Sequence, residues 1–111
     1  MEREPRMTLQ TQAVLAVLLD HPSADHYGLE ISKRAKLPSG TIYPILARLQ
    51  KAGWVTSSWE ELDPQAEGRP ARRLYRLTQS GAERARQAQA ETVSRIAPRW
   101  VPAPRLGEAK P

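Results

Sequence analysis

Two short basic segments of this chain carry the side chains needed to bind phosphate groups. The first, residues 38–52, contains Arg48 and Lys51 and no acidic residue. Phosphates attract guanidinium and ammonium groups and repel carboxylates, so an acid-free surface of this kind favours a polyanionic partner. In the second segment, Arg69 and Arg72 follow the last acidic residue of a polar stretch. The pattern predicts two separate contacts with a nucleic acid backbone.

Residues 38–52 are predicted to form a helix with an apolar side and a slim side. At 100° per residue, four aliphatic side chains fall within a narrow arc that we expect to face the core: Ile42, Ile45, Leu46 and Leu49. The opposite side carries small or mildly basic residues, which would let the helix enter a major groove. Hydroxyls and backbone N–H groups at its start are suited to base edges or phosphates. The residues expected to contact DNA from this helix are Ser39, Gly40, Thr41, Tyr43, Pro44, Arg48 and Lys51. The alternative is an ordinary surface helix of a small bundle.

Pro44 breaks a local rule, because a proline inside a helix removes one hydrogen bond and costs about 3 kcal/mol. One interpretation starts the helix at Pro44 and leaves residues 38–43 as a loop. We favour the longer helix, with a slightly distorted first turn.

Hydrophobic patterning predicts a framework that positions these segments. Leu37 and Pro38 form a join short enough to hold two helices at a steep angle, as a helix-turn-helix requires. Thr8, Asp25 and Thr78 are candidate N-caps. The predicted elements are helices at 8–20, 26–36 and 38–52, strands at 54–62 and 73–77 around a hairpin tip at 63–72, and a helix at 78–97. The predicted fold class is therefore mainly α with a small β-hairpin, in the order of a winged helix-turn-helix.

The hairpin, or wing, is predicted to be the second contact. We expect Arg69 and Arg72 at its tip, free to reach a phosphate or a narrow minor groove. The alternative is a solvated hairpin with internal ion pairs. Tyr27, at the start of the second helix, either places its hydroxyl on a phosphate or is a half-buried amphipathic residue, and the sequence leaves both open.

The last helix is rich in Ala and poor in large side chains, which favours close approach of a partner helix. We interpret it as a dimer arm that packs on the first helix of a second protomer, the alternative being a frayed solvent helix. From Pro98 onward we expect an extended or disordered tail, because three prolines oppose a helix. The residues predicted at the dimer interface are Val14, Leu18, Ala85, Val93, Ile96 and Trp100.

Composition excludes several classes of function. The 111 residues include no Cys, so disulfides, thiolate metal sites and a cysteine nucleophile are excluded. The chain carries a formal charge of +5 with a pI near 10.1. No P-loop or nucleophile elbow is present, and we expect neither enzymatic activity nor a cofactor. His21 and His26 lie near Asp20 and Asp25, but loop polarity explains them better than a metal does. No apolar run reaches the length of a membrane span and no secretory leader is evident, so a cytoplasmic protein is expected.

Four segments of the chain together resemble the PadR family of bacterial transcriptional regulators, in its short form with one C-terminal helix. The matching segments are residues 27–31 (Tyr-Gly-Leu-Glu-Ile), 40–49 (Gly-Thr-Ile-Tyr-Pro-Ile-Leu-Ala-Arg-Leu), 53–55 (Gly-Trp-Val) and 68–78 (Gly-Arg-Pro-Ala-Arg-Arg-Leu-Tyr-Arg-Leu-Thr), with Gly81. The resemblance implies a homodimeric winged-helix repressor and makes an internal Pro44 expected. Two features depart from the family: Pro38 replaces a Ser-like cap after a longer turn, and the C-terminal helix is unusually rich in Ala.

The sequence thus predicts a sequence-specific regulator that binds double-stranded DNA as a homodimer. It would have an N-terminal arm (1–7), a winged helix-turn-helix domain (8–77), a dimerisation helix (78–97) and a Pro-rich tail (98–111). The alternatives are an architectural or recombination-directing factor of a mobile element and a winged-helix module that binds protein. Nothing in the sequence identifies a small-molecule effector.

Overall fold

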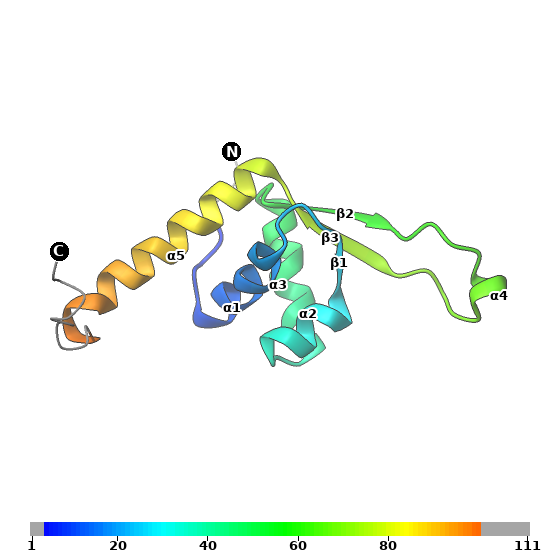
Figure 1. Cartoon of the computed structure of the whole chain (residues 1–111), viewed down its shortest axis with the longest axis horizontal. Helices are drawn as coiled ribbons and strands as arrows, with labels where there is room; N and C mark the ends of the chain where they lie inside the picture. The colour runs from blue at the N-terminus through cyan, green and yellow to red at the C-terminus, as the bar shows by residue number, and fades with distance from the viewer. Residues whose placement is uncertain (1–3, 101–111) are drawn as a thin grey trace, which may run out of the picture.

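A bundle of three short helices carries a small sheet on one side and a long helix at its C-terminal end (Figure 1). The computed structural model describes residues 4–100, and the side chains of residues 4–96. The sheet extends away from the bundle as a wing, opposite in direction to the long helix (Figure 1). The elements are α1 (Leu9–Asp20), β1 (His26–Tyr27), α2 (Gly28–Ala35), α3 (Ser39–Lys51), β2 (Val55–Trp59), α4 (Pro64–Glu67), β3 (Arg73–Leu77) and α5 (Gln79–Trp100).

The core lies between α1, α2, α3 and the base of the sheet. The predicted apolar side of α3 faces it, and the side chains there are between 0% and 2% exposed: Ile42, Ile45, Leu46 and Leu49. From α1, Leu15 and Leu18 are completely covered, and Ile31 of α2 closes the centre. Each such aliphatic side chain stabilises the fold by about 1.5–3 kcal/mol through its removal from water. This shared core fixes the angle between α2 and α3.

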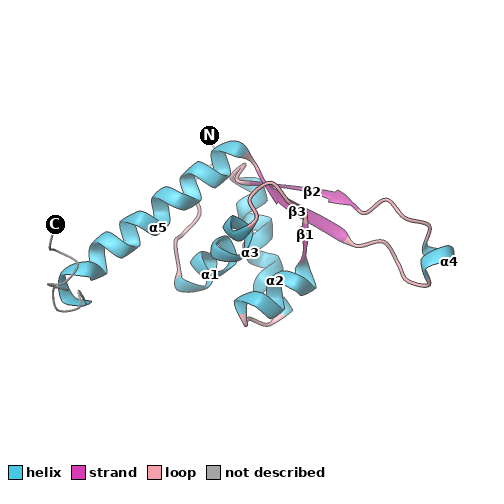
Figure 2. Ribbon diagram, viewed as in Figure 1, coloured by secondary structure: helices cyan, strands magenta, loops and turns pink. Residues whose placement is uncertain are grey.

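The sheet has three antiparallel strands in the order β1-β3-β2 (Figure 2). Val55 pairs with Leu77 and Ser57 with Tyr75, and His26 of β1 pairs with Tyr75 on the other side of β3. Paired residues point to the same face, so the buried Val55, Tyr75 and Leu77 define the face that packs on the helices. We call this the inner face of the wing.

The start of α3 confirms the longer of the two predicted helices. The carbonyl oxygen of Pro38 accepts hydrogen bonds from the N–H groups of Thr41 (2.9 Å) and Ile42 (3.1 Å). The helix begins at Ser39 and continues through Pro44 to Lys51. Pro44 is exposed at the sixth position of α3, where it removes one hydrogen bond, the one that an N–H there would donate to the Gly40 carbonyl oxygen.

Two of the three predicted N-caps are confirmed. The Thr8 hydroxyl oxygen accepts from the Thr11 N–H at 3.1 Å, and the Thr78 hydroxyl oxygen accepts from the Gly81 N–H at 2.9 Å. The prediction for Asp25 is wrong. Residues 26–27 pair with β3, so α2 begins at Gly28 and Asp25 instead forms an ion pair with Arg76 at 3.0 Å.

Two boundaries differ from those predicted. The strand expected to reach residue 62 ends at Trp59, and the hairpin tip contains a helical turn, α4, capped by the Asp63 carboxylate, which accepts from the Gln65 N–H at 3.1 Å. The last helix does not stop before Pro98 but runs to Trp100. Pro98 removes a single hydrogen bond, and the rest of the helical backbone remains in register. No helix in the described part of the chain is long and apolar enough to cross a membrane.

The predicted dimer interface is corrected at three positions. Val14, Leu18 and Ala85 are each 0% exposed within one chain, where the packing of α1 against α3 and α5 already covers them. They therefore have no free surface for a partner. Val93 and Ile96 are 60% and 48% exposed on α5. The side chain of Trp100 lies outside the described ones.

Candidate nucleic-acid interface

The outer side of α3 is exposed and slim, as its periodicity predicts. Because the aliphatic side chains face the core, the opposite side carries only small, aromatic or basic residues. Thr41 is partly buried. The exposed members are Ser39, Gly40, Tyr43, Pro44, Ala47, Arg48 and Lys51. Their exposure leaves a surface without carboxylates along all 13 residues of the helix.

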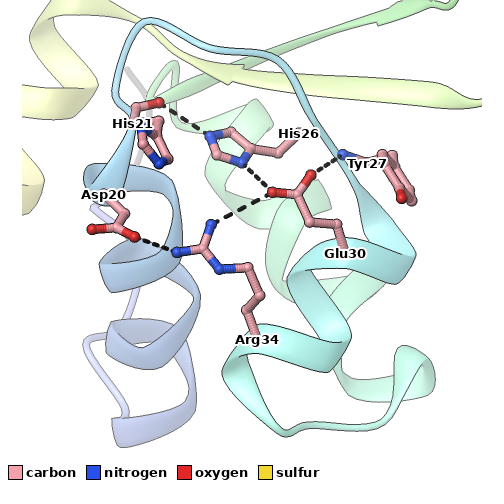
Figure 3. A network of polar contacts seen from close by, with 6 residues as sticks. All are labelled: Asp20, His21, His26, Tyr27, Glu30 and Arg34. Carbon is pink, nitrogen blue, oxygen red and sulfur yellow. Dashed lines mark hydrogen bonds and ion pairs between the residues drawn. The ribbon is translucent and has the colours of Figure 1, made fainter.

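The acid of the neighbouring helix α2 is held away from this surface. Glu30 lies between α1 and α2, where its carboxylate accepts from His26 Nδ1 at 3.0 Å and from the Tyr27 N–H at 3.4 Å (Figure 3). Arg34 bridges Glu30 at 3.5 Å to Asp20 of α1. The network pairs both acids with Arg34 and ties α2 to α1, which holds the Glu30 carboxylate away from α3.

The wing arginines do not lie as predicted. Arg69 forms a two-pronged ion pair with Glu60, with Nη1–Oε1 at 2.7 Å and Nη2–Oε2 at 3.1 Å. Glu60 also accepts from the Arg72 backbone N–H at 3.2 Å. The hydrogen bond from Arg69 holds the pKa of the Glu60 carboxyl below its ordinary value, and desolvation opposes this. Arg69 is therefore not free, and the expectation of internal ion pairs is confirmed for this residue.

The tip of the wing is acidic rather than basic. Asp63 and Glu67 belong to the turn of α4, and both are exposed. Arg69 and Arg72 lie on the returning leg, nearer to the body of the protein. Order along the chain alone did not reveal this, because the reversal of direction falls before the arginines, at residues 64–67.

Arg72 stacks on Tyr27. The guanidinium carbon lies 4.3 Å from the centroid of the phenol ring, within the range of a cation–π contact. Tyr27 is half-buried and joins β1 to α2, so this stack fastens the wing to the helix-turn-helix. A phosphate contact by the Tyr27 hydroxyl stays a prediction.

Tyr43 links α3 to α2. Its ring lies against Gly28 at the start of α2, where a side chain would leave no room for it. Burial raises the pKa of the Tyr75 phenol, and neighbouring Tyr43 raises it further, whereas Arg73 lowers it. Tyr27, which precedes Gly28, carries the Arg72 stack, so residues 27–28 contact both α3 and the wing.

The sequence of this site matches a known family. The family model of the PadR-like transcriptional regulators matches residues 14–87, which include α1, the helix-turn-helix, the wing and the start of α5. The chain belongs to this PadR-like family. Membership identifies it as a DNA-binding transcriptional regulator with a winged-helix fold.

Solved structures agree with this assignment. A candidate DNA-binding protein of Ralstonia eutropha JMP134 is 31% identical, with a TM-score of 0.57 over 75% of this chain and 98% of the other. A PadR family transcription regulator of Clostridium difficile R20291 has a TM-score of 0.66 at 22% identity, over 86% of this chain and 100% of the other. A PadR-like regulator of Bacillus cereus ATCC 14579 has a TM-score of 0.57 at 21% identity, over 79% and 87%. The last two support the fold. Among curated proteins, none matches significantly.

Sequence reasoning missed three residues of the PadR-like wing. Glu60 is the partner of Arg69, a pairing that the order of charges along the chain does not specify. Trp59 and Arg73, from the two long strands, form a second cation–π pair at 5.1 Å. The alternation of β3 contained a usable signal, because it places Arg73 on the same face as Tyr75.

Proposed function

We propose that this PadR-like protein is a repressor that binds specific sites in double-stranded DNA as a homodimer in the cytoplasm. Helix α3 enters the major groove, and the wing lies on flanking phosphates or in the adjacent minor groove. Family membership supplies the coarser statement, a DNA-binding transcriptional regulator. The role acts through occupancy of the DNA and needs neither catalysis nor a cofactor.

One observation carries the proposal: the outer side of α3 is open, slim and free of acids. A major groove about 12 Å wide admits a helix only where its side chains are short or can reach base edges and phosphates. Gly40, Pro44 and Ala47 keep this side thin, and Arg48 and Lys51 supply positive charge. The two cations form no ion pair within the part of the chain that the structure describes. They are therefore available to phosphates.

The first turn of α3 and the rest of the helix are suited to different contacts with DNA. Ser39, Gly40 and Thr41 lie at the end where the helix dipole favours anions. The N–H groups of Ser39 and Gly40 precede the first hydrogen bond of the helix, which Thr41 donates to Pro38. Ser and Thr hydroxyls there can also bond base edges. We propose that this turn reads sequence, whereas Arg48, Lys51 and Arg72 position the protein on the backbone. Arg69 can bind a phosphate only if its ion pair with Glu60 breaks.

The long α5 supports a dimer. It has 22 residues, about 33 Å at 1.5 Å per residue, and it projects from the body (Figure 1). Val93 and Ile96 are exposed on it. A two-fold dimer would present two copies of α3 to half-sites about one helical turn apart. A dimer held across a promoter excludes polymerase, which is the basis of the repressor role. No effector is assigned.

Selection of bound sites from random duplexes at physiological salt tests the proposal. We expect a palindromic site with half-sites about one turn apart, and Thr41→Ala should change the preferred bases within each half-site. Arg48→Gln and Lys51→Gln should weaken binding to all sequences alike. Arg86→Gln, with the same change of charge on α5, is the matched control and should bind as the parent does. Recovery of tandem direct sites would instead indicate an architectural factor, and recovery of no duplex would indicate a protein-binding module.

A further inference from the structure

We propose that Arg73, oriented by Ser57 and Trp59, is a phosphate-binding group of the wing besides Arg72 and holds a backbone phosphate of duplex DNA beside the groove that α3 enters. This inference rests on the proposed function and deepens it. It moves the wing contact from the hairpin tip, where the sequence predicts it, to the inner face near the body.

The register places Arg73 on the inner face. Arg73 pairs with Trp59, two residues along from the pair of Tyr75 with Ser57. Since side chains alternate along a strand, Arg73 and Trp59 share a face with the buried Tyr75. Arg72 is on the opposite face, where it meets Tyr27. Of these two adjacent arginines, Arg73 is therefore the one that points to the same side as the helices.

The guanidinium of Arg73 is held in one orientation and keeps N–H donors free for a ligand. Its Nε and Nη2 atoms donate to the Ser57 hydroxyl oxygen at 3.2 and 2.9 Å, and its carbon lies 5.1 Å from the centroid of the Trp59 ring. A guanidinium has five N–H donors, so the two directed at Ser57 leave three on the outer edge. That edge matches the spacing of two phosphate oxygens.

The charge of Arg73 is also uncancelled. Two other wing arginines are neutralised, because Arg69 pairs with Glu60 at 2.7 Å and Arg76 pairs with Asp25 at 3.0 Å, whereas Arg72 stacks on Tyr27. Arg73 forms no ion pair among residues 4–96. Its partners, a hydroxyl and an indole, fix its direction without removing its charge. An exposed, pre-oriented and unpaired arginine is what a phosphate contact requires.

Trp59 extends the same surface. It is 61% exposed, and its ring lies beneath Arg73 rather than in the core. A rigid aromatic side chain next to the cation can rest against the sugar of the bound nucleotide and exclude water from the phosphate contact. The pair thus offers an apolar part and a cationic part to the alternating sugar and phosphate of a DNA strand.

The same face leads to the base of the sheet, which packs on α3. Arg73 lies two residues from the buried Tyr75 on one face of β3, and β2, the strand paired with β3, packs against α3. Tyr43 is 46% exposed on α3. A strand of DNA that follows this row passes from the major-groove helix to Arg73, which gives a flanking phosphate a fixed position relative to the groove.

The test compares Arg73→Gln with Arg76→Gln in the full chain. Both substitutions remove one positive charge from β3, but Arg76 is on the other face and already paired with Asp25. Duplex DNA carrying the selected site is titrated at several salt concentrations. For Arg73→Gln we expect about tenfold weaker binding and a salt slope shallower by about 0.9 for each wing bound. Arg76→Gln should keep the parental slope.

Ser57→Ala provides a second variant that leaves the charge in place. It removes the acceptor that orients Arg73, so we expect about threefold weaker binding with an unchanged salt slope. Circular dichroism and unfolding curves establish that each variant folds. If Arg73→Gln were poorly folded, Ser57→Ala and Arg73→Lys would decide, and parental affinity in both would overturn the proposal.

The outcomes separate this inference from the proposed function. A parental protein that binds no duplex at low salt contradicts both. Steep, salt-dependent binding by the parent with the same slope in Arg73→Gln contradicts only the role of Arg73. Equal losses in Arg73→Gln and Arg76→Gln would show a general effect of charge and would also overturn it. Polyglutamate is the control ligand. If the parent bound polyglutamate but not DNA, and Arg73→Gln lost that binding, Arg73 and Trp59 would be assigned to an acidic protein partner instead.

Discussion

Gly28 lies directly against the ring of Tyr43. A methyl group on Gly28 would lie 2.5 Å from the ring carbon that bears the Tyr43 hydroxyl, far inside van der Waals contact. Gly28 begins α2 and Tyr43 is in α3, so the absence of a side chain lets an aromatic residue of the proposed recognition helix rest on the preceding helix. Space, rather than backbone conformation, explains the glycine here.

Gly28→Ala should therefore displace Tyr43 and weaken DNA binding more than it weakens the fold. The clashing atoms are at the free end of an exposed side chain, which can swing outward at a cost of about 1 kcal/mol. Unfolding in urea and DNA titration measure the two effects. In a Tyr43→Ala background, Gly28→Ala should have no further effect on DNA binding. Equal losses of affinity in both backgrounds would contradict the contact.

Two other glycines should respond in opposite directions to replacement by Ala. At Gly81, a methyl group would lie 2.6 Å from the carbonyl carbon of Trp54, and neither backbone can move freely, so we expect a loss of about 3 kcal/mol in the free energy of unfolding. At Gly40 no atom lies within 4 Å, and Gly40→Ala should stabilise α3 by about 1 kcal/mol. Equal shifts in the two unfolding curves would show that packing around Gly81 is looser than the structure indicates.

His26 should contribute to stability through both ring nitrogens. It is 2% exposed, and Nδ1 faces the Glu30 carboxylate at 3.0 Å while Nε2 faces the His21 carbonyl oxygen at 3.1 Å (Figure 3). His26→Ala removes both contacts together with a buried ring and should destabilise the protein by about 3 kcal/mol in urea unfolding. His21→Ala is the control, because its exposed side chain is lost while its carbonyl remains. A similar small change in both variants would contradict this account.

The Glu60–Arg69 pair should make the stability of the wing depend on acid pH. The pKa of Glu60 is lower in the folded protein than its ordinary value of 4.5, so the pair contributes fully above that value. The contribution is lost as the pH falls through the lower, folded value. The parent should therefore unfold at higher urea than Glu60→Gln at pH 7, and the difference should vanish in stronger acid. A difference that stays constant with pH would show that the carboxylate charge is not what stabilises the wing.

Local patterns were sufficient for the core side of α3 and for two of the three predicted caps. The spacing of Ile42, Leu46 and Leu49 identified the core side of α3, because residues three or four apart in sequence lie on the same face of a helix. Thr78 was recognisable as a cap because its partner, the Gly81 N–H, is only three residues away. The β3 strand was also correctly bounded, since its alternation and the preceding turn are both local.

Contacts between distant segments were not predictable in the same way. The ion pair of Arg69 with Glu60 depends on where the hairpin reverses, and the helical turn of α4 moved that point away from the arginines. Likewise, an apolar position such as Val14 or Ala85 needs a cover, but periodicity does not say whether the cover is the same chain or a partner. The structure assigns both to the core of one chain.

The most direct test of the central claim is methylation interference with dimethyl sulfate on the selected DNA site. The reagent marks guanine N7, which faces the major groove. If the acid-free side of α3 occupies that groove, methylation of guanines within each half-site should block binding, and guanines outside the site should have no effect. Binding that tolerates N7 methylation throughout the site would contradict the account, because no helix could then lie in the major groove there.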